Sequence, residues 1–224
     1  EIANSIAKAV EGAESMAGVP INNVICSLSG GRPITKIVRN KIKIENGRVD
    51  KNDIFKILKV KNYTEIEDYE IISSSVIKYY LDNNTSVDNP IGIYTDSLTV
   101  EISYTYGQKS IIKNITSAIN LCHLSVEKFF ICSEASGIST MVQDERNNGA
   151  IVIDLGANIT SVGMFQNNKI IFSDSIPIGG LHITSDIVRG LGTKSEDAEK
   201  IKILHGSTLI KETDEYINLD IPII

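Results

Sequence analysis

The sequence has no tryptophan, and only three cysteines, three histidines and five prolines among its 224 residues. Cys26, Cys122 and Cys132 are far apart and form no CxxC pair. This spacing argues against a disulfide framework or a zinc knuckle and favours a reducing cytoplasm. No apolar run approaches the roughly 18 residues that a membrane-spanning helix needs, and no signal peptide opens the chain.

The sequence also lacks a strong excess of charge. The 22 Lys and Arg residues against 28 Asp and Glu residues give a formal net charge of −6. Without a basic patch to displace counterions from phosphates, nucleic acid is not an expected partner. Apolar residues make up 42% and charged residues 22%, which is typical of a globular protein. This length allows one large domain or two small ones.

Apolar periodicity predicts an α/β protein. Helices are predicted from residue 2 to Gly18 and over 53–60, 109–122, 134–142, 184–191 and 195–205. Strands are predicted over 24–28, 34–44, 69–81, 98–106, 129–132, 150–154, 161–165 and 169–175. Residues 144–148 are predicted to form a polar connector. We interpret both ends as cuts through a longer protein, because the chain starts inside a helix and stops in the apolar run 218–224.

The segment after Ala150 has the order of a phosphate-binding device. An apolar strand ends on Asp154, the small-residue turn Gly156-Ala157-Asn158 follows, and a second strand comes next. Backbone N–H groups of such a turn can face phosphate oxygens, and small side chains permit close approach. The carboxylate can orient a metal ion or its bound water. Gly179-Gly180, ahead of a helix, offers a second set of N–H groups.

A further pair favours a nucleotide. Glu199 and Lys202 are three residues apart and share one helical face, from which they could hold the two hydroxyls of a ribose. Each feature has a structural alternative: Asp154 as a turn or cap residue, Gly179-Gly180 as a simple turn, and Glu199 with Lys202 as a solvated ion pair. His182 lies beside the glycine turn. The features in this order and spacing together favour a nucleotide site.

Several stretches of the sequence resemble those of a known family. Residues 150–206 resemble the second half of the ATPase superfamily that includes actin, heat-shock chaperones and sugar kinases. Within it, almost the whole chain resembles the FtsA family of bacterial cell-division proteins. The stretches that carry the resemblance are Ala13–Gly18, Ser27–Gly30, Asn89–Gly92, Asp154–Gly156, Ile176–Gly180, Ile183–Ile187 and Asp197–Lys202 with Gly206. The stretch from Ile176 to Gly206 is the most specific, because three family signatures stand there in register.

The resemblance implies part of an actin-like, ribonuclease-H-like two-lobed α/β fold with an inserted α+β subdomain. The implied parts are subdomain 1A over 1–22, the inserted subdomain 1C over 23–107, the return to 1A over 108–149, and the start of subdomain 2A over 150–224. The family's first phosphate loop, subdomain 2B and C-terminal amphipathic membrane helix would lie outside this chain.

The second phosphate motif departs from the family pattern, Asp-Ile/Leu-Gly-Gly-Gly-Thr-x-Asp. Ile159 replaces the hydroxyl residue and Ser161 replaces the final Asp, although Thr160 could supply a hydroxyl and Asn158 could adopt a left-handed backbone. The resemblance therefore implies that the protein binds ATP with Mg²⁺. The replaced residues imply that hydrolysis is weak or absent, and we assign no catalytic residue. The implied contacts are Asp154 (to Mg²⁺ through water), Gly156, Ala157, Asn158, Thr160, Gly179, Gly180, Glu199 and Lys202.

The implied function is that of an ATP-binding adaptor that associates with itself and links the tubulin-like FtsZ to the inner membrane. It would act at the cytoplasmic face of the division site, with later division proteins docking on residues 23–107. Three alternatives stay open: a pilus-assembly ATPase homologue, a small-molecule kinase, and a degenerate scaffold that binds no nucleotide. A kinase needs a carboxylate placed as a base for a substrate hydroxyl, and none is evident.

Overall fold

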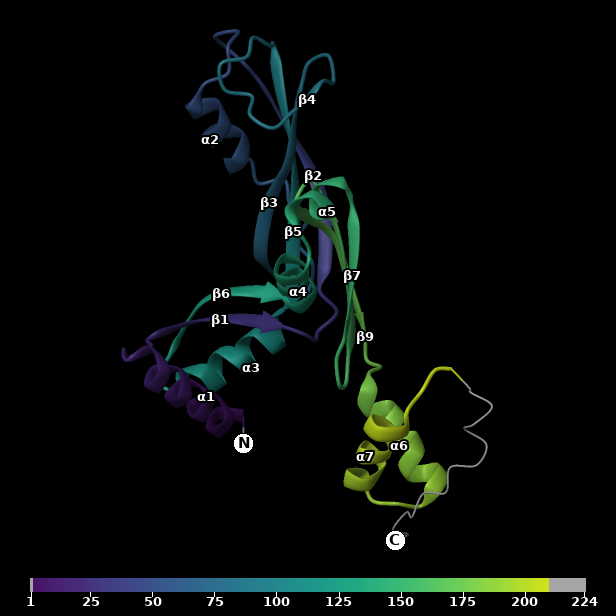
Figure 1. The fold of residues 1–224 in the computed structure, drawn as a ribbon. Helices are drawn as coiled ribbons and strands as arrows, with labels where there is room; N and C mark the ends of the chain where they lie inside the picture. The colour runs from purple at the N-terminus through teal and green to yellow at the C-terminus, as the bar shows by residue number, and fades with distance from the viewer. Residues whose placement is uncertain (1, 210–224) are drawn as a thin grey trace. The chain divides into compact units, whose positions relative to one another are not determined.

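A computed structural model of the protein describes residues 2–209. It confirms a mixed α/β chain and divides into two compact units. The described part of the first unit comprises residues 2–154 and 161–175, and that of the second comprises residues 155–160 and 176–209. Figure 1 draws both units and labels most of their elements. Among residues 2–209, no helix is both long and apolar enough to cross a membrane.

Two parallel strands form the first sheet. Strand β1 (Asn23–Leu28) pairs with β6 (Ser125–Ile131), and helix α3 (Lys109–Asn120) packs along them (Figure 1). Helix α1 (Ile2–Ala17) packs against α3. The Cys122 thiol donates to the carbonyl of Ala3 at 3.2 Å and so joins α1 to the end of α3. Cys26, Cys122 and Cys132 are all free and partly buried.

Four antiparallel strands form the second sheet, in the order β2-β5-β3-β4. They are β2 (Ile34–Lys43), β3 (Tyr69–Leu81), β4 (Ser86–Val87) and β5 (Ser97–Gln108). Helix α2 (Lys51–Lys59) packs on this sheet. The buried core of this part comprises Ile44, Val49, Ile57, Tyr79, Leu98, Val100, Ile102, Tyr104 and Tyr106. Helix α2 begins two residues before the predicted start because Asp50 and Asp53 exchange side-chain to backbone hydrogen bonds.

The two chain segments that connect the second sheet to the rest of the first unit lie side by side. A Cβ atom built on Gly31 would lie 3.5 Å from Cβ of Gln108 and 2.6 Å from Cδ1 of Ile111. The Tyr69 hydroxyl donates to the Gly31 carbonyl at 3.4 Å. Residues 31 and 108 are therefore neighbours, as expected at the base of an inserted unit.

The pairing of β1 bears on the predicted inserted segment 23–107. Strand β1 pairs with β6, whereas β2 to β5 form a sheet of their own. We therefore propose that the insert starts after Leu28 rather than at residue 23. Its assignment as subdomain 1C stays a prediction.

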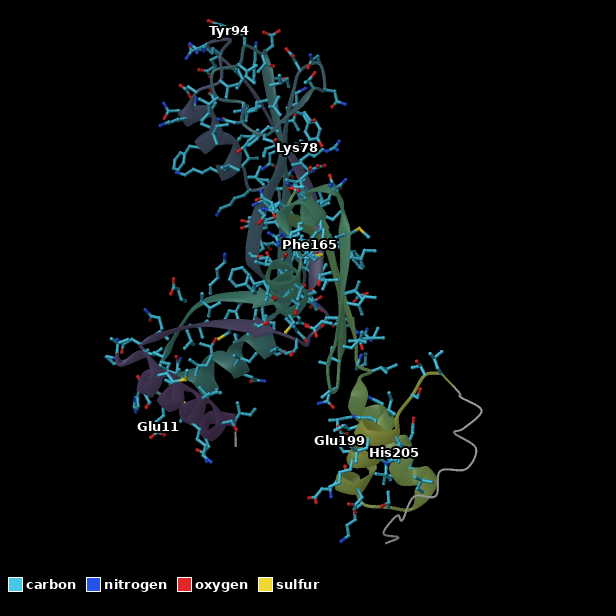
Figure 2. All side chains as sticks on the ribbon, in the orientation of Figure 1. Glu11, Lys78, Tyr94, Phe165, Glu199 and His205 are labelled. Atoms are coloured by element: carbon cyan, nitrogen blue, oxygen red, sulfur yellow. The ribbon has the colours of Figure 1, made fainter. Side chains whose placement is uncertain are left out.

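The third sheet contains β7 (Ala150–Leu155), β8 (Thr160–Gln166) and β9 (Lys169–Ile176) in that order. Phe165, labelled in Figure 2, is 1% exposed and packs with Ile131 and Ile170. The Ser103 hydroxyl donates to the Ile170 carbonyl at 2.9 Å. Strands β7 to β9 thus group largely with the first unit, and the start of subdomain 2A at residue 150 stays a prediction.

Two short helices precede this sheet. Helix α4 (Cys132–Thr140) was expected near its observed place, but helix α5 (Gln143–Asn148) covers the predicted polar connector. That prediction is wrong because Glu145 caps the helix: its carboxylate accepts the Val142 N–H at 2.9 Å.

Helices α6 (Gly180–Leu191) and α7 (Ser195–His205) pack together in the second unit (Figure 1). Helix α6 begins at Gly180, four residues before the predicted start, and ends at Gly192, whose φ of 63° is left-handed. Helix α6 starts early because its first N–H groups donate to the carbonyls of Gly156 and Ala157 in a neighbouring loop.

Candidate nucleotide site

The predicted phosphate loop lies against the start of α6. Within the loop, the Gly156 N–H donates to the Ile159 carbonyl at 3.0 Å. Across to the helix, the Gly180 N–H donates to the Gly156 carbonyl at 3.0 Å and the Leu181 N–H donates to the Ala157 carbonyl at 2.8 Å. The loop carbonyls thereby satisfy first-turn donors that have no side-chain cap, which explains the early start of α6.

Glycine is required at position 179 because this contact leaves no space for a side chain. A Cβ atom there would lie 2.4 Å from the Gly156 carbonyl oxygen and 2.6 Å from that of Ala157. Its φ of −160° is ordinary extended backbone, so close approach of two backbones, rather than conformation, selects glycine. A Cβ on Gly156 would also lie 2.8 Å from the Ile159 carbonyl oxygen.

The structure brings the two glycine segments together, but their N–H groups have protein acceptors. Besides the two bonds from Gly180 and Leu181, the Gly179 N–H donates to Nδ1 of His182 at 3.1 Å. The predicted second set of donors is therefore engaged inside the protein in this conformation. A phosphate could reach them only by displacing the Gly156 and Ala157 carbonyls or the His182 ring.

The remaining loop residues differ from expectation. The Thr160 hydroxyl donates to the Ile178 carbonyl at 2.7 Å, so it ties the loop to the segment before α6. Asn158 does not have a positive φ, so it does not use the left-handed backbone that asparagine can adopt. Ser161 is buried in β8, whereas Ile159 is half-buried.

A hydrogen-bonded cluster joins α7 to the start of α6. Glu199, labelled on α7 in Figure 2, accepts from Lys202 at 2.7 Å and from the Thr184 hydroxyl at 2.5 Å, both at Oε2. Lys202 Nζ also donates to Oγ1 of Thr184 at 3.0 Å and to the Gly180 carbonyl at 3.2 Å. Thr184 is 1% exposed. The hydrogen bonds from Lys202, and next those from Thr184, lower the pKa of the Glu199 carboxyl.

Asp154 belongs to the first unit. Its Oδ2 accepts the Ser136 hydroxyl at 2.8 Å, which orients the carboxylate. A carboxylate held in this way suits a water-mediated contact to Mg²⁺. Among residues 2–209, there is no group of three or more His, Cys, Asp or Glu side chains that could hold a metal ion.

Sequence reasoning noted His182 beside the glycine turn but missed Thr184 as the partner of Glu199 and Lys202, and Ser136 as the partner of Asp154. The motif Ile183–Ile187 contained one feature that could have identified Thr184. This residue lies one helical turn after Gly180 and therefore on the same face of the helix. Its contact with α7 depends on helix packing that local periodicity does not encode.

Comparison with solved structures identifies the fold. The chain is similar to the PilM–PilN type IV pilus biogenesis complex, with a TM-score of 0.55 and 12% identity over 90% of this chain and 56% of that chain. At this identity the similarity concerns the fold alone. The predicted fold is confirmed: this is an actin-like fold with an inserted domain.

Two family models identify the family within that fold. "Cell division protein FtsA" matches residues 151–223, and "SHS2 domain inserted in FTSA" matches residues 30–105. FtsA of Agrobacterium fabrum is 34% identical over 214 residues and 95% of this chain. FtsA of Rhizobium meliloti is 33% identical over 96% of it, and that of Bacillus subtilis 26% over 96%. The chain belongs to the FtsA family. It spans about half the length of these relatives, between 48% and 50%.

Proposed function

We propose that this protein is an ATP-binding, actin-like adaptor of cell division whose output is assembly rather than catalysis. One observation carries the nucleotide part: the loop 156–160 is hydrogen-bonded to the start of α6, and α7 places Glu199 beside the same turn. Family membership favours this function over a pilus-assembly ATPase or a small-molecule kinase. Nucleotide occupancy would set the relative position of the lobes and hence the contacts between subunits.

The proposed site uses this chain's residues as follows. Glu199 accepts a ribose hydroxyl, and the backbone of Gly156, Ala157 and Asn158 approaches the phosphates. The N–H groups of Gly180 and Leu181 exchange their loop carbonyls for phosphate oxygens. Asp154 orients a water on Mg²⁺, and the ion, when bound, neutralises phosphate charge.

A direct test is titration of the full-length protein with ATP and Mg²⁺ by calorimetry. We expect saturable binding below millimolar concentration and little competition from a nucleoside without phosphates. If the protein does not bind ATP at millimolar concentration, this proposal is wrong and a scaffold without nucleotide is favoured instead.

Slow hydrolysis is part of the proposal. Ile159 offers no hydroxyl and Ser161 no carboxylate where the family pattern has both. The loss of one hydrogen bond to a charged group costs roughly 1.5–3 kcal/mol, or about tenfold to a hundredfold in rate. The double variant Ile159→Thr, Ser161→Asp should therefore raise ATP turnover more than ATP affinity. Equal turnover by the unmodified protein would show that these two replacements have no catalytic meaning.

The proposed partners are FtsZ, further copies of the protein, and later division proteins that dock on the inserted segment. The inner membrane would be bound at its cytoplasmic face through a C-terminal helix outside this chain. Family membership supports these partners. Co-sedimentation of the full-length protein with FtsZ polymers, with and without vesicles, tests the link.

One observation favours a second candidate, a scaffold that binds no nucleotide. The N–H groups of Gly179, Gly180 and Leu181 are all satisfied by protein acceptors, so these three groups offer no free donor to an anion in this conformation. The ATP titration separates the two functions.

A further inference from the structure

Helix α2 of the inserted sheet carries positive charge and apolar side chains together on its outer side. Its exposed residues, which we call the basic face of α2, are Lys51, Asn52, Phe55, Lys56, Leu58 and Lys59. Phe55 is 60% and Leu58 is 40% exposed. The Lys59 ammonium lies 4.1 Å from the centroid of the Phe55 ring, so charge and apolar surface are directly adjacent.

The two carboxylates at the start of α2 are engaged in capping. Oδ1 of Asp50 accepts the Asp53 N–H at 2.8 Å, and Oδ2 of Asp53 accepts the Asp50 N–H at 3.1 Å. Asp53 is 8% exposed and is the one acidic residue within the helix. The basic face therefore has three lysines and no carboxylate to neutralise them.

The stability of the helix does not account for this face. The helix dipole favours Lys56 and Lys59 in the last turn but disfavours Lys51 at the first position. The opposite side of α2 packs on the sheet (Figure 1): Ile57 is fully buried, and Asn40 of β2 donates to its carbonyl at 3.3 Å. Phe55 and Leu58 contribute little to that core because they lie on the outer side.

We propose that the basic face of α2 contacts the anionic headgroups of a lipid bilayer. Lysines beside exposed Phe and Leu are the pattern of helices that lie in a membrane interface. The ammonium groups would pair with lipid phosphates, while Phe55 and Leu58 enter the apolar boundary below the headgroups. An acidic protein segment would match the charge, but side chains that protrude from a convex helix enter a fluid boundary without needing a preformed pocket.

This contact assists a stronger anchor rather than replacing one. Each lysine near an anionic surface changes the affinity about fivefold, and stable attachment of a protein to a membrane takes more than one such signal. The inference rests on the attachment to the inner membrane in the proposed function and adds a contact made by the inserted sheet.

The contact is tested at position 55 in the full-length protein. The vesicles contain equal parts of phosphatidylglycerol and phosphatidylcholine with brominated acyl chains, which quench a tryptophan that reaches them. After subtraction of the signal of the unmodified protein, the emission of Phe55→Trp should shift to the blue and be quenched. Ile37→Trp is the matched control. Ile37 is 47% exposed on β2 and, three residues from Asn40, faces away from α2, so its emission should not change.

A second measurement tests the charge. Lys56→Gln/Lys59→Gln should weaken sedimentation with these vesicles at low salt by roughly tenfold or more. The control Lys41→Gln/Lys43→Gln removes the same charge from exposed lysines on the other face of the sheet and should bind as the unmodified protein does. Thermal unfolding of both double variants verifies that they are folded.

The outcomes separate this inference from the proposed function. If the protein sediments with the vesicles but position 55 is not quenched, α2 makes no lipid contact and an acidic protein segment is the favoured occupant, while the membrane attachment stands. Equal binding by the two double variants would also overturn the proposal. If the unmodified protein binds no vesicle, the membrane attachment itself is wrong, and this inference with it.

Discussion

At the scale of single residues, the site depends on one glycine that permits contact between two backbones. Gly179→Ala would place a methyl group 2.4 Å from the Gly156 carbonyl oxygen, a separation that backbone atoms cannot relieve without moving apart. We expect the loop to detach from α6, the melting temperature to fall, and ATP affinity to drop by about tenfold or more.

The control for this prediction lies in the same helix. A Cβ atom on Gly190 would meet nothing within 4 Å, so Gly190→Ala should leave ATP binding unchanged and stabilise α6 by roughly 0.5–1 kcal/mol. Calorimetry and thermal unfolding of both variants provide the comparison. Equal behaviour of the two variants would contradict the close-contact explanation.

A second residue-scale prediction concerns Glu134 in α4. Its side chain is 8% exposed and Oε2 has no partner, and burial raises the pKa of its carboxyl against the opposing charges of Lys128 and Lys169. The folded state therefore binds this proton more tightly than the unfolded state, and stability falls as pH rises from the ordinary carboxyl range through the raised pKa.

Glu134→Leu should accordingly gain about 1–3 kcal/mol at pH 7, the usual cost of an unsatisfied buried polar group. The gain should shrink as pH approaches about 4, where the carboxyl of the unmodified protein is protonated. Denaturant unfolding across this pH range measures it, with the exposed Glu127→Leu as the control. A variant less stable than the unmodified protein at every pH would show that Glu134 has a stabilising partner.

At the scale of elements, helix α4 and strand β8 are packed through a glycine. A Cβ atom on Gly137 would lie 2.4 Å from Cε2 of Phe165, a ring that is 1% exposed. Gly137→Ala should lower the free energy of unfolding by roughly 1–3 kcal/mol through overpacking. Gly12→Ala in α1, where a Cβ meets nothing within 4 Å, should be neutral or stabilising. Chemical denaturation distinguishes them, and equal stabilities would mean that the Phe165 ring moves freely.

At the scale of the whole molecule, the inserted sheet is joined to the rest through neighbouring residues. Because residues 31 and 108 are adjacent, a short linker can replace residues 32–105 without stretching β1 or α3. We expect this deletion to keep ATP affinity within a few-fold and to abolish self-association or recruitment of division proteins. Calorimetry and sedimentation measure the two properties. Loss of ATP affinity with recruitment preserved would place the nucleotide function, not the protein contacts, on the insert.

The sequence by itself determined the features that depend on local backbone preference. Turn residues and apolar alternation located most strands and helices, and the motifs around Asp154, Gly179 and Glu199 indicated the family that the comparisons confirm. Such features are readable because strand and helix periods differ and because glycine and asparagine mark turns.

Tertiary structure decided where hydrogen bonds are satisfied. Strand β1 pairs with β6, about a hundred residues away, and α6 begins at Gly180 because loop carbonyls accept its first donors. Lys202, whose ribose contact stays a prediction, donates to Glu199, Thr184 and Gly180, which its place in the sequence did not reveal. A residue's type states how many bonds it can make; only the packing of distant segments determines which partners receive them.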